Sequence, residues 1–387
     1  MIWFGAVDRV RMNEVVLQKS LNMRATWPAS GTRPVLQSEY PAAAERFQQR
    51  LLPQVSRTFA LTIPQLPAPL ASVVGNAYLW CRVADTVEDE PHLDAATKQH
   101  LHATLVDVID GAADAATWAQ RAHAGLSDAT PAAERELLAG TAHVAALTRT
   151  FTPLQVRAIR TCVKKMCQGM THFELSVSRH GLETAADLDR YCYYVAGVVG
   201  EMLTALFCDY SPDMAARQTE MTQLSASFGQ GLQMTNILKD VWEDLDEGRC
   251  WLPRQVFADF GYNLGELDPR TNRDAFNAAM RELVGIAHGH LRNALNYSLL
   301  VPKYESGIRR FCLWSLGLSL LTLQRIVRNR NFASSEEVKI SRLAVGATVT
   351  STNLVAHHNL PVRLMFELAA HRLPLKSAPI GCSFDLG

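Results

Sequence analysis

The sequence predicts an all-α protein made of one helical domain. Apolar residues recur every three or four positions along most of the 387-residue chain, as they do on the buried face of a helix. No segment shows the alternation of apolar and polar residues that is typical of a half-buried strand. No internal repeat and no low-complexity linker divides the chain. We therefore expect one helical domain over residues 38–372, with a loose leader at 1–37 and a frayed tail at 373–387.

Each predicted helix follows from its own apolar spacing. Ser38 and Pro41 are typical of a helix start. Apolar residues at helical spacing predict further helices at 70–81, 188–207, 224–232 and 311–327. Breaks between helices are expected where turn-forming residues cluster, at 64–69, 112–116, 127–131, 178–183, 211–213, 248–253 and Pro302.

The overall composition is that of an ordinary globular protein. Hydrophobic residues make up 48% and charged residues 20%, which is enough for a sizeable core. The 38 basic and 38 acidic residues cancel, so no global basic field favours a nucleic-acid partner. The eight cysteines form no CxxC pair, which argues against a disulfide framework and against a zinc site. We expect buried thiols in a reducing cytosol.

Two apolar segments bear on the membrane. The N-terminal stretch at 1–7 has no preceding positive charge and is too short for a signal peptide. The longest uncharged apolar run, 311–324, is too short to cross a bilayer. We therefore expect a cytoplasmic protein without a transmembrane segment.

The first candidate motif is Asp85-Thr-Val-Glu-Asp89. Residues three or four apart share one face of a helix, so Asp85 and Asp89 fall on one stripe with Tyr78 and Arg82. That stripe continues an apolar one, which places it toward the core. Carboxylates in such a place are costly unless they are neutralised or bound to a cation.

The second candidate motif lies on a predicted helix that begins as an apolar row. Leu224, Phe228 and Leu232 recur every four residues. The same row then becomes polar, and Gln233 and Glu243 lie beside it; its polar members are Asn236, Asp240 and Asp244. A helix that changes from apolar to acidic along one side is expected to line a deep pocket with a metal-binding mouth.

The two motifs together favour a magnesium–diphosphate site. Either pair of aspartates alone is better explained as a solvated acidic face of a helix. Magnesium prefers oxygen ligands and commonly binds one or two carboxylates together with substrate phosphates. Two facing pairs could hold such ions against a diphosphate and promote ionisation of its carbon–oxygen bond. The apolar rows would then house a hydrocarbon tail and exclude water.

These motifs resemble those of the squalene/phytoene synthase family. Asp85–Asp89 and Asp240-Val-Trp-Glu-Asp244 are similar to the two aspartate-rich motifs of that family. Three other segments also match in order and spacing: Val55-Ser-Arg-Thr-Phe59, Tyr191-Cys-Tyr-Tyr-Val-Ala-Gly-Val-Val-Gly200 and Gly248-Arg-Cys-Trp-Leu-Pro253. The resemblance covers about residues 38–351. It implies a class I isoprenoid synthase bundle around a central cavity, and a magnesium-dependent prenyltransferase that joins two isoprenoid diphosphates head to head.

The resemblance also implies roles for individual residues. The expected magnesium ligands are Asp85, Asp89, Asp240 and Asp244. The expected substrate-binding residues are Ser56, Arg57, Phe59, Gln233, Asn236, Lys239 and Arg249. The expected catalytic residues are Tyr191, Arg82 and Tyr78. Arginine suits this task because its guanidinium group binds phosphate in a bidentate manner.

Several of these residues also have a purely structural interpretation. Tyr191 could be a core tyrosine, and Ser56 could begin a helix. Gln233 could cap a backbone group. Lys239 and Arg249 could pair at the surface with Glu243 and Glu247, and the small residues at 196–200 could serve close helix packing.

The segment Val338-Lys-Ile-Ser-Arg342 resembles a segment of the reducing squalene synthases that is associated with NADPH. The resemblance implies a cofactor site at Lys339 and Arg342, and a farnesyl-diphosphate farnesyltransferase that makes squalene. Ser341 interrupts the basic run, and the chain has no GxGxxG dinucleotide fingerprint. A phytoene or dehydrosqualene synthase without reduction therefore stays open, as does the choice between farnesyl and geranylgeranyl diphosphate.

Three other classes compete. Head-to-tail prenyltransferases and terpene cyclases usually carry a DDxxD motif, whereas Ala84 precedes Asp85 here. A non-catalytic scaffold relative would be expected to lose the four aspartates. A calcium-binding loop would need a glycine that neither motif has.

Because a squalene-sized product is insoluble in water, loose contact with a membrane surface is also expected.

Overall fold

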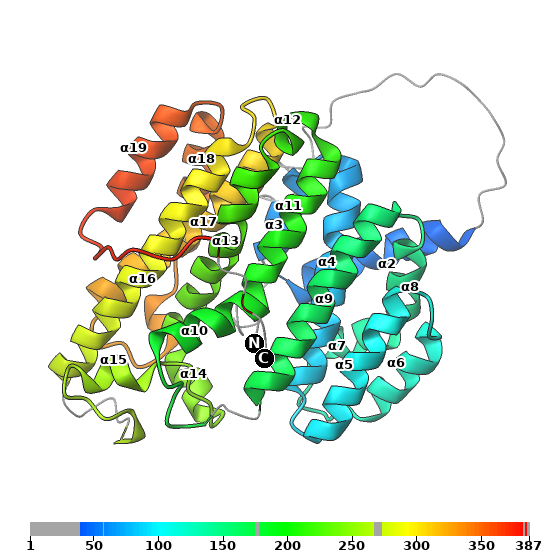
Figure 1. The fold of residues 1–387 in the computed structure, drawn as a ribbon, viewed down its shortest axis with the longest axis horizontal. Helices are drawn as coiled ribbons and strands as arrows, with labels where there is room; N and C mark the ends of the chain where they lie inside the picture. Colours follow the sequence, from blue (N-terminus) through cyan, green and yellow to red (C-terminus); the bar gives the residue numbers. More distant parts are fainter. Residues whose placement is uncertain (1–38, 57, 175–177, 267–272, 382–383, 385–387) are drawn as a thin grey trace.

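The computed structural model describes residues 39–56, 58–174, 178–266, 273–381 and 384, and they form an all-α bundle (Figure 1). Over these residues the only β-type pairing is two isolated bridges, Ser178 with Cys250 and Leu182 with Pro253. The predicted all-α fold is confirmed. The expected leader at 1–37 lies outside the described residues.

The helices follow one another with short connections. In chain order the α-helices are α2 (Glu39–Val55), α3 (Thr58–Thr62), α4 (Ala68–Asp89), α5 (Ala95–Ile109), α6 (Ala115–Ala124), α7 (Ala132–Ala139), α8 (Thr141–Thr148), α9 (Pro153–Glu174), α10 (Ala185–Cys192), α11 (Val198–Tyr210), α12 (Pro212–Ala215), α13 (Gln218–Lys239), α14 (Val241–Asp246), α15 (Arg254–Ala258), α16 (Arg273–Leu300), α17 (Ser306–Arg328), α18 (Arg342–Val355) and α19 (Asn359–Ala370). The tighter or wider turns are η1 (Ile63–Gln65), η2 (Tyr193–Gly197), η3 (Leu264–Glu266) and η4 (Ser335–Val338).

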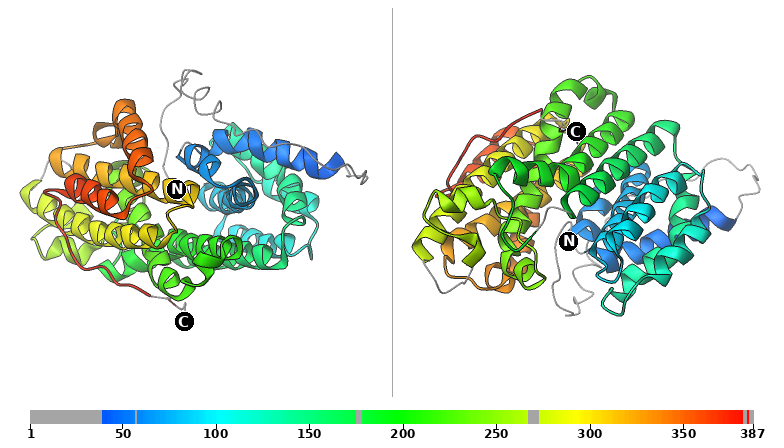
Figure 2. Two further views of the ribbon diagram at one scale, coloured as in Figure 1. Left: turned by 90° about the horizontal axis from the view of Figure 1, so that it is seen from above. Right: turned by 60° about the horizontal axis from the view of Figure 1, so that its bottom comes forward.

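The bundle has an early half and a late half. Seen from above, the helices from α2 to α8 gather on one side and those from α15 to α19 on the other, with the middle helices joining the two (Figure 2). Helix α13 is the central element, because it packs against α10, α11, α16 and α17. The acidic end of α13 therefore lies inside the molecule.

Helix α4 is rich in apolar residues, and it is therefore buried on nearly every side. Polar side chains fix it against α8: Asn76 Nδ2 donates to the Val144 carbonyl at 3.0 Å, and Trp80 Nε1 donates to Thr148 Oγ1 at 2.8 Å. Buried hydrogen bonds of this kind specify one arrangement of two helices, because any other arrangement leaves their donors unpaired. The first aspartate motif is thereby held on a rigid element.

The segment Ala185–Tyr210 runs through α10, η2 and α11 as one long helix. It is the one helix among the described residues that is long and apolar enough to cross a membrane, and 72% of its most apolar window is buried inside the bundle. Its turn Tyr193–Gly197 is π-helical. Such turns insert one extra residue into a helix and often occur at functional sites.

Two elements differ from the sequence-based expectation. The polar row of the second motif was expected on one helix, but α13 ends at Lys239 and α14 begins at Val241, with Asp240 between them. The tail was expected to fray, but residues 374–381 form a strap along α16. Lys376 N donates to the Gly285 carbonyl at 3.0 Å, and Gly381 N donates to the Gln223 carbonyl at 2.9 Å.

Candidate active site

The first motif occupies the C-terminal half of α4, where three polar side chains share a buried face. Arg82 Nη1 lies 3.7 Å from Asp85 Oδ2, and the same guanidinium pairs with Glu134 of α7. Tyr78 lies one turn earlier, and its hydroxyl donates to the Val55 carbonyl at 3.0 Å. Burial raises the pKa of Tyr78 to about 12 and that of Asp85 well above its usual range. The motif therefore faces inward, as its spacing predicts.

The second motif lies at the junction of α13 and α14. Asn236, Asp240 and Asp244 are all buried. Burial raises the pKa of Asp240, and it raises that of Asp244 to about 7. Lys239 Nζ donates to Asp240 Oδ1 at 2.5 Å, so Lys239 is a buried partner of the motif. The expected surface pair of Lys239 with Glu243 does not form.

Arg249 joins the two motifs. It lies in the loop after α14, and its backbone N donates to the Asp244 carbonyl at 2.8 Å. Its Nη1 lies 3.5 Å from Asp89 Oδ1 at the end of α4. It also pairs with Glu247, as the structural interpretation expected. Arg249 thus connects the two motifs, with its guanidinium at Asp89 and its backbone N at Asp244.

Tyr191 lies between the motifs and is fully buried. Its ring stacks on Trp251 with centroids 3.8 Å apart and an interplanar angle of 9°, and Phe173 meets it edge-on. Burial raises the pKa of Tyr191 well above its usual range, and the neighbouring carboxylates of Glu88 and Asp244 raise it further. A tyrosine in that position stays protonated, and it lies close to carboxylates of both motif segments.

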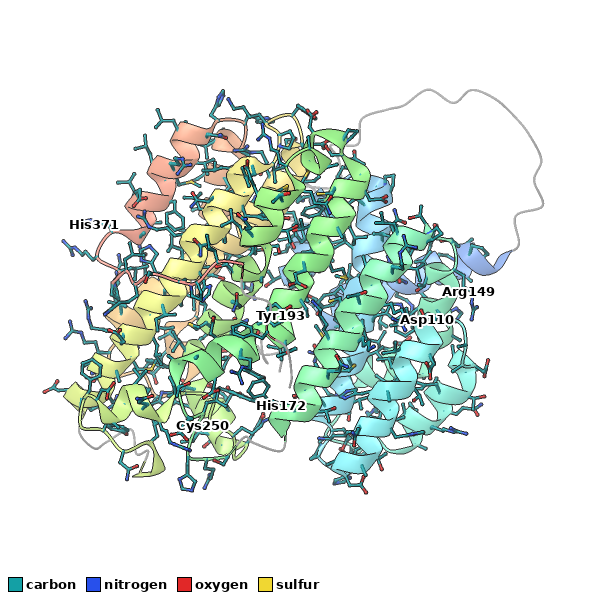
Figure 3. All side chains as sticks on the ribbon, in the orientation of Figure 1. Asp110, Arg149, His172, Tyr193, Cys250 and His371 are labelled. Carbon is teal, nitrogen blue, oxygen red and sulfur yellow. The ribbon has the colours of Figure 1, made fainter. Side chains whose placement is uncertain are left out.

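The loop that carries Trp251 is fixed by backbone pairing. Cys250 N donates to the Ser178 carbonyl at 3.2 Å, and Leu182 N donates to the Leu252 carbonyl at 3.0 Å. In Figure 3, Cys250 lies at the lower end of the bundle together with His172 of α9, below Tyr193. The segment after the second motif is therefore attached to the segment that leads into α10.

An apolar pocket lies further along α13 from the acidic residues. It encloses about 370 Å³, measured to the solvent at its mouth. Its wall is almost entirely apolar and comes from α3, α11, α13, α16 and α17: Phe59, Gly200, Leu203, Phe207, Phe228, Gly229, Leu232, Tyr297, Phe311, Cys312 and Ser315. The row of Phe228 and Leu232 thus lines a pocket, as predicted, and the apolar wall of this pocket is typical of sites for apolar ligands.

The acidic mouth has donor groups that suit a hard cation. Among the described residues, Asp85 Oδ1, Gln233 Oε1 and both amide atoms of Asn236 are buried without a hydrogen-bond partner. Buried polar atoms are nearly always paired, so these unpaired oxygens fit a site that binds a ligand. The part of the chain that the structure describes contains no group of three or more His, Cys, Asp or Glu side chains close enough to hold an ion alone. A magnesium ion that shares its ligands with a phosphate needs only one or two carboxylates.

The entry segment shows a mixed outcome. Ser56 Oγ accepts from Phe59 N at 3.0 Å, so it begins α3, as its structural interpretation expected. Phe59 lies between Tyr78 and Phe311, with ring centroids 5.2 and 6.3 Å away, and it walls the pocket. Arg57 lies outside the described residues.

The expected cofactor segment lies beside the second motif. Ser335 N, at the start of η4, donates to Glu243 Oε1 of α14 at 2.7 Å. Lys339 follows η4 and pairs with Glu336 at 2.7 Å. Arg342 is exposed at the start of α18. The segment is therefore close to the site, and Lys339 is held by a carboxylate of its own turn.

A buried polar chain that the sequence did not reveal holds α10 against α13 and α16. Asn293 Nδ2 donates to Ser227 Oγ at 2.9 Å, and Ser227 Oγ lies 2.7 Å from His290 Nδ1. His290 Nε2 lies 2.9 Å from Asp189 Oδ1, which also accepts from Gln230 Nε2 at 2.8 Å. Asp189 is two residues before Tyr191, so the chain fixes the helix that carries this tyrosine. The sequence did not reveal these contacts because they join residues far apart along the chain. The pair of Glu134 with Arg82 was missed for this reason as well.

Replacing His290 with alanine is expected to lower the free energy of unfolding by about 3 kcal/mol, because it leaves a cavity and removes the buried hydrogen bond between His290 Nδ1 and Ser227 Oγ. His288 on the same helix is a matched control. It is also buried, but its Nδ1 meets only the Pro374 carbonyl, at 2.8 Å. His288→Ala is expected to cost about 1 kcal/mol. Urea unfolding measures both, and equal losses would show that the polar chain adds nothing beyond packing.

Comparisons with known proteins agree with this geometry. A model of the squalene/phytoene synthase family matches residues 52–344. The chain is 31% identical to a squalene synthase of Botryococcus braunii over 80% of this chain and 65% of the relative. It is 30% identical to the squalene synthase R6 of Phoma sp. over 84% of this chain and 74% of the relative. The chain thus spans just under two thirds of the Botryococcus relative.

Solved structures show the same fold. The structure of TcSQS with the ligand BPH1237 has a TM-score of 0.71 and 25% identity, and the match covers 87% of this chain and 94% of that one. A dehydrosqualene synthase has a TM-score of 0.61 at 22% identity over 82% of this chain and 97% of that one, which shows the fold alone. With the family match spanning both aspartate motifs and the residues that line the pocket, the chain belongs to the squalene/phytoene synthase family.

Proposed function

We propose that the chain is a squalene synthase. It would condense two molecules of farnesyl diphosphate head to head into a cyclopropyl diphosphate and then reduce this intermediate with NADPH. The observation that carries the proposal is the geometry of one helix. Phe228 and Leu232 of α13 line an apolar pocket, the buried Asn236 follows on the same row, and the buried Asp240 comes directly after the end of the helix. Such a site suits a substrate with an apolar tail and a diphosphate head.

The chain's own residues would bind and orient the diphosphates. Asp85 and Asp89 on α4 and Asp240 and Asp244 around the start of α14 would hold magnesium, with Asn236 and Gln233 supporting the second pair. Magnesium supplies the positive charge that stabilises a departing diphosphate. Arg82 and Arg249 lie at the two motifs and would bind diphosphate oxygens through their guanidinium groups. Lys239, Ser56, Arg57 and Tyr78 would complete the binding of the head groups.

Loss of the first diphosphate leaves an allylic cation, which the chain must protect from water. The pocket wall does this with aromatic side chains, among them Phe59, Phe207 and Phe228. Tyr191 would act as a proton carrier or would stabilise positive charge through its ring, and a hydroxyl that stays protonated suits the second role better. Its stacking on Trp251 fixes the plane of the ring for either role.

NADPH would supply the hydride that converts the final cation to squalene, and Lys339 and Arg342 would bind the cofactor. The support for this is the position of η4 beside α14, through the contact of Ser335 with Glu243. Loss of a proton in place of hydride addition would give dehydrosqualene. A synthase without reduction is therefore the second candidate, and a non-catalytic scaffold is the third.

The test of the proposed function is an incubation with farnesyl diphosphate and magnesium, with and without NADPH, followed by mass spectrometry of the extract. Squalene formed only with NADPH would support the proposal in full. Dehydrosqualene under both conditions would keep the condensation and remove the reduction. If farnesyl diphosphate gives no product, the same assay is repeated with geranylgeranyl diphosphate. No product from either substrate would favour the scaffold.

Replacing Lys339 with alanine is expected to divert product from squalene to dehydrosqualene by about tenfold when NADPH is below saturation, because a cationic contact to the cofactor is lost. Lys303→Ala, an exposed lysine outside this segment, is the control and should leave the ratio unchanged. The ratio is read by mass spectrometry over a series of NADPH concentrations. An unchanged ratio in Lys339→Ala at every concentration would exclude Lys339 from the cofactor site.

The protein is further proposed to act in the cytoplasm, in loose contact with a membrane surface that receives the hydrocarbon product. The membrane contact is inferred from the proposed product, a hydrocarbon that is insoluble in water.

A further inference from the structure

Helices α18 and α19 form an outer layer over α17, and their outward faces are unusually apolar. Of the twelve large hydrophobic side chains that are exposed among the described residues, seven lie between residues 343 and 380. Five of these are leucines on the two helices, with exposed fractions of 55–84%: Leu343, Leu354, Leu360, Leu364 and Leu368. Soluble proteins rarely gather exposed apolar side chains in this way without a binding role.

Helix α19 has apolar stripes on two opposite sides. Val362, Phe366 and Ala370 recur every four residues, are buried, and pack toward α16 and α17. Leu360, Leu364 and Leu368 recur at the same spacing and are offset by two residues, which turns them about 200° away from the buried stripe. The inner stripe accounts for the packing of α19, and the outer stripe has no such role in the described structure.

Helix α18 also packs one side on the bundle and exposes apolar residues on the opposite side, and that outer side has no charged residue. Thr348 faces α17, since a side chain placed at Gly317 would meet its methyl group at 2.8 Å. The opposite side presents Leu343, Ala347, Thr350 and Leu354, all exposed. From Leu343 to Val355 the helix contains no charged residue. An exposed helix in water normally carries charged residues on its outer face.

The charged residues of the segment that contains these leucines are mostly basic. The whole chain is neutral, but between Lys339 and Gly381 it has five lysine and arginine residues and a single acidic residue, Glu367. That glutamate is paired with Arg292 of α16 at 2.6 Å. Arg342, Arg363 and Arg372 are exposed, and none forms an ion pair with another described residue. In Figures 1 and 3, α19 and His371 lie at the outer edge of the molecule.

We propose that the outer face of α18 and α19 docks on the surface of an anionic lipid bilayer. Leucines that insert at the boundary of the head groups, flanked by arginines that meet anionic lipids, are the two features that hold a helix in a membrane interface. The basic excess selects this occupant over a second copy of the chain, because a second copy would bring a face of the same sign. The proposal rests on the proposed function only for what the docking would serve, the release of a water-insoluble product.

The test is sedimentation of the full-length protein with phospholipid vesicles. The wild-type protein is expected to bind mixed phosphatidylglycerol–phosphatidylcholine vesicles at low salt, and to bind pure phosphatidylcholine vesicles at least about tenfold more weakly. The double variant Leu364→Ser/Leu368→Ser should lose about tenfold or more in partitioning to the mixed vesicles. The control is Leu154→Ser/Phe260→Ser, which removes two exposed hydrophobic side chains outside this face and should bind as the wild type does.

Equal vesicle binding by the two double variants would overturn the proposal. So would a wild-type dimer in sedimentation velocity that Leu364→Ser/Leu368→Ser converts to a monomer, because the face would then belong to a second copy. Turnover of detergent-dispersed farnesyl diphosphate separates this proposal from the proposed function. The leucine variant should keep wild-type turnover there while it loses vesicle binding, and an inactive wild-type protein that still binds vesicles would reject the proposed function alone.

Discussion

Replacing Asp85 with alanine is expected to lower kcat for product formation from farnesyl diphosphate by at least about a thousandfold, without loss of helix content. The carboxylate is buried and one of its oxygens has no hydrogen-bond partner among the described residues, so its removal deletes a ligand from the proposed magnesium site. The fold should survive because Arg82, its neighbour, keeps its pair with Glu134. Burial raises the pKa of Asp85, so its charge is costly to the metal-free protein.

Asp246→Ala provides the control for this experiment. Asp246 ends α14, two residues after Asp244, and its side chain is exposed. Its removal should change kcat by less than about threefold. Circular dichroism and thermal unfolding of both variants accompany the kinetics. If Asp85→Ala unfolds the bundle, the aspartate is structural, and if it keeps wild-type turnover, it holds no required cation.

Replacing Gly229 with alanine is expected to have the largest effect on stability, about 3 kcal/mol or more. A Cβ atom at Gly229 would come within 2.0 Å of the Ala196 carbonyl oxygen. A Cβ atom at Gly200 would come equally close to the Ser225 carbonyl oxygen. Both obstacles are backbone atoms, which cannot rotate away. α13 would have to move off the π-helical turn at Tyr193–Gly197, and the pocket wall that contains Gly229 and Gly200 would open. Urea unfolding and KM for farnesyl diphosphate should both change.

Gly346→Ala is expected to have the opposite sign. Gly346 lies inside α18, and a Cβ atom there would meet no atom within 4 Å. Alanine should therefore stabilise the protein by about 0.5–1 kcal/mol, because glycine is the poorer helix former. Stabilisation by both substitutions would mean that α13 and the π-helical turn are not in close contact. For Gly200 both interpretations apply, because it allows close helix packing and also lines the pocket.

The helices and the pocket could be predicted because both follow from spacing within one element. Phe228, Leu232, Asn236 and Asp240 are spaced four residues apart, so the period of a helix alone predicts an apolar wall followed by an acidic mouth. The break between α13 and α14 could not be predicted, because no glycine or proline marks Asp240 and the buried partner Lys239 becomes visible only in three dimensions. The same holds for Glu134 and for the chain from Asp189 to Asn293, which join helices far apart in the sequence.

The leucine face of α18 and α19 escaped prediction for a different reason. Spacing alone assigns any apolar row to a core, and α19 has two such rows. Only the structure shows that Val362 and Phe366 use the inner side while Leu364 and Leu368 remain outside. The strap at 374–381 was missed because it has no periodicity, and its pairing depends on Gly285 and Gly289 of α16, which leave room for its backbone.

The strap also has a consequence for the order of events during synthesis. Gly381 binds the backbone of α13 at Gln223, and the hydroxyl of Tyr194 donates to the Phe384 carbonyl at 2.6 Å. These contacts join Gly381 and Phe384 to helices made about 160 to 190 residues earlier. The helices from α2 to α9 can collapse while translation continues, but the covering of α16 and the π-helical turn must wait until residues 374–384 have been made. A nascent chain stalled before residue 374 would therefore expose this surface to chaperones and proteases.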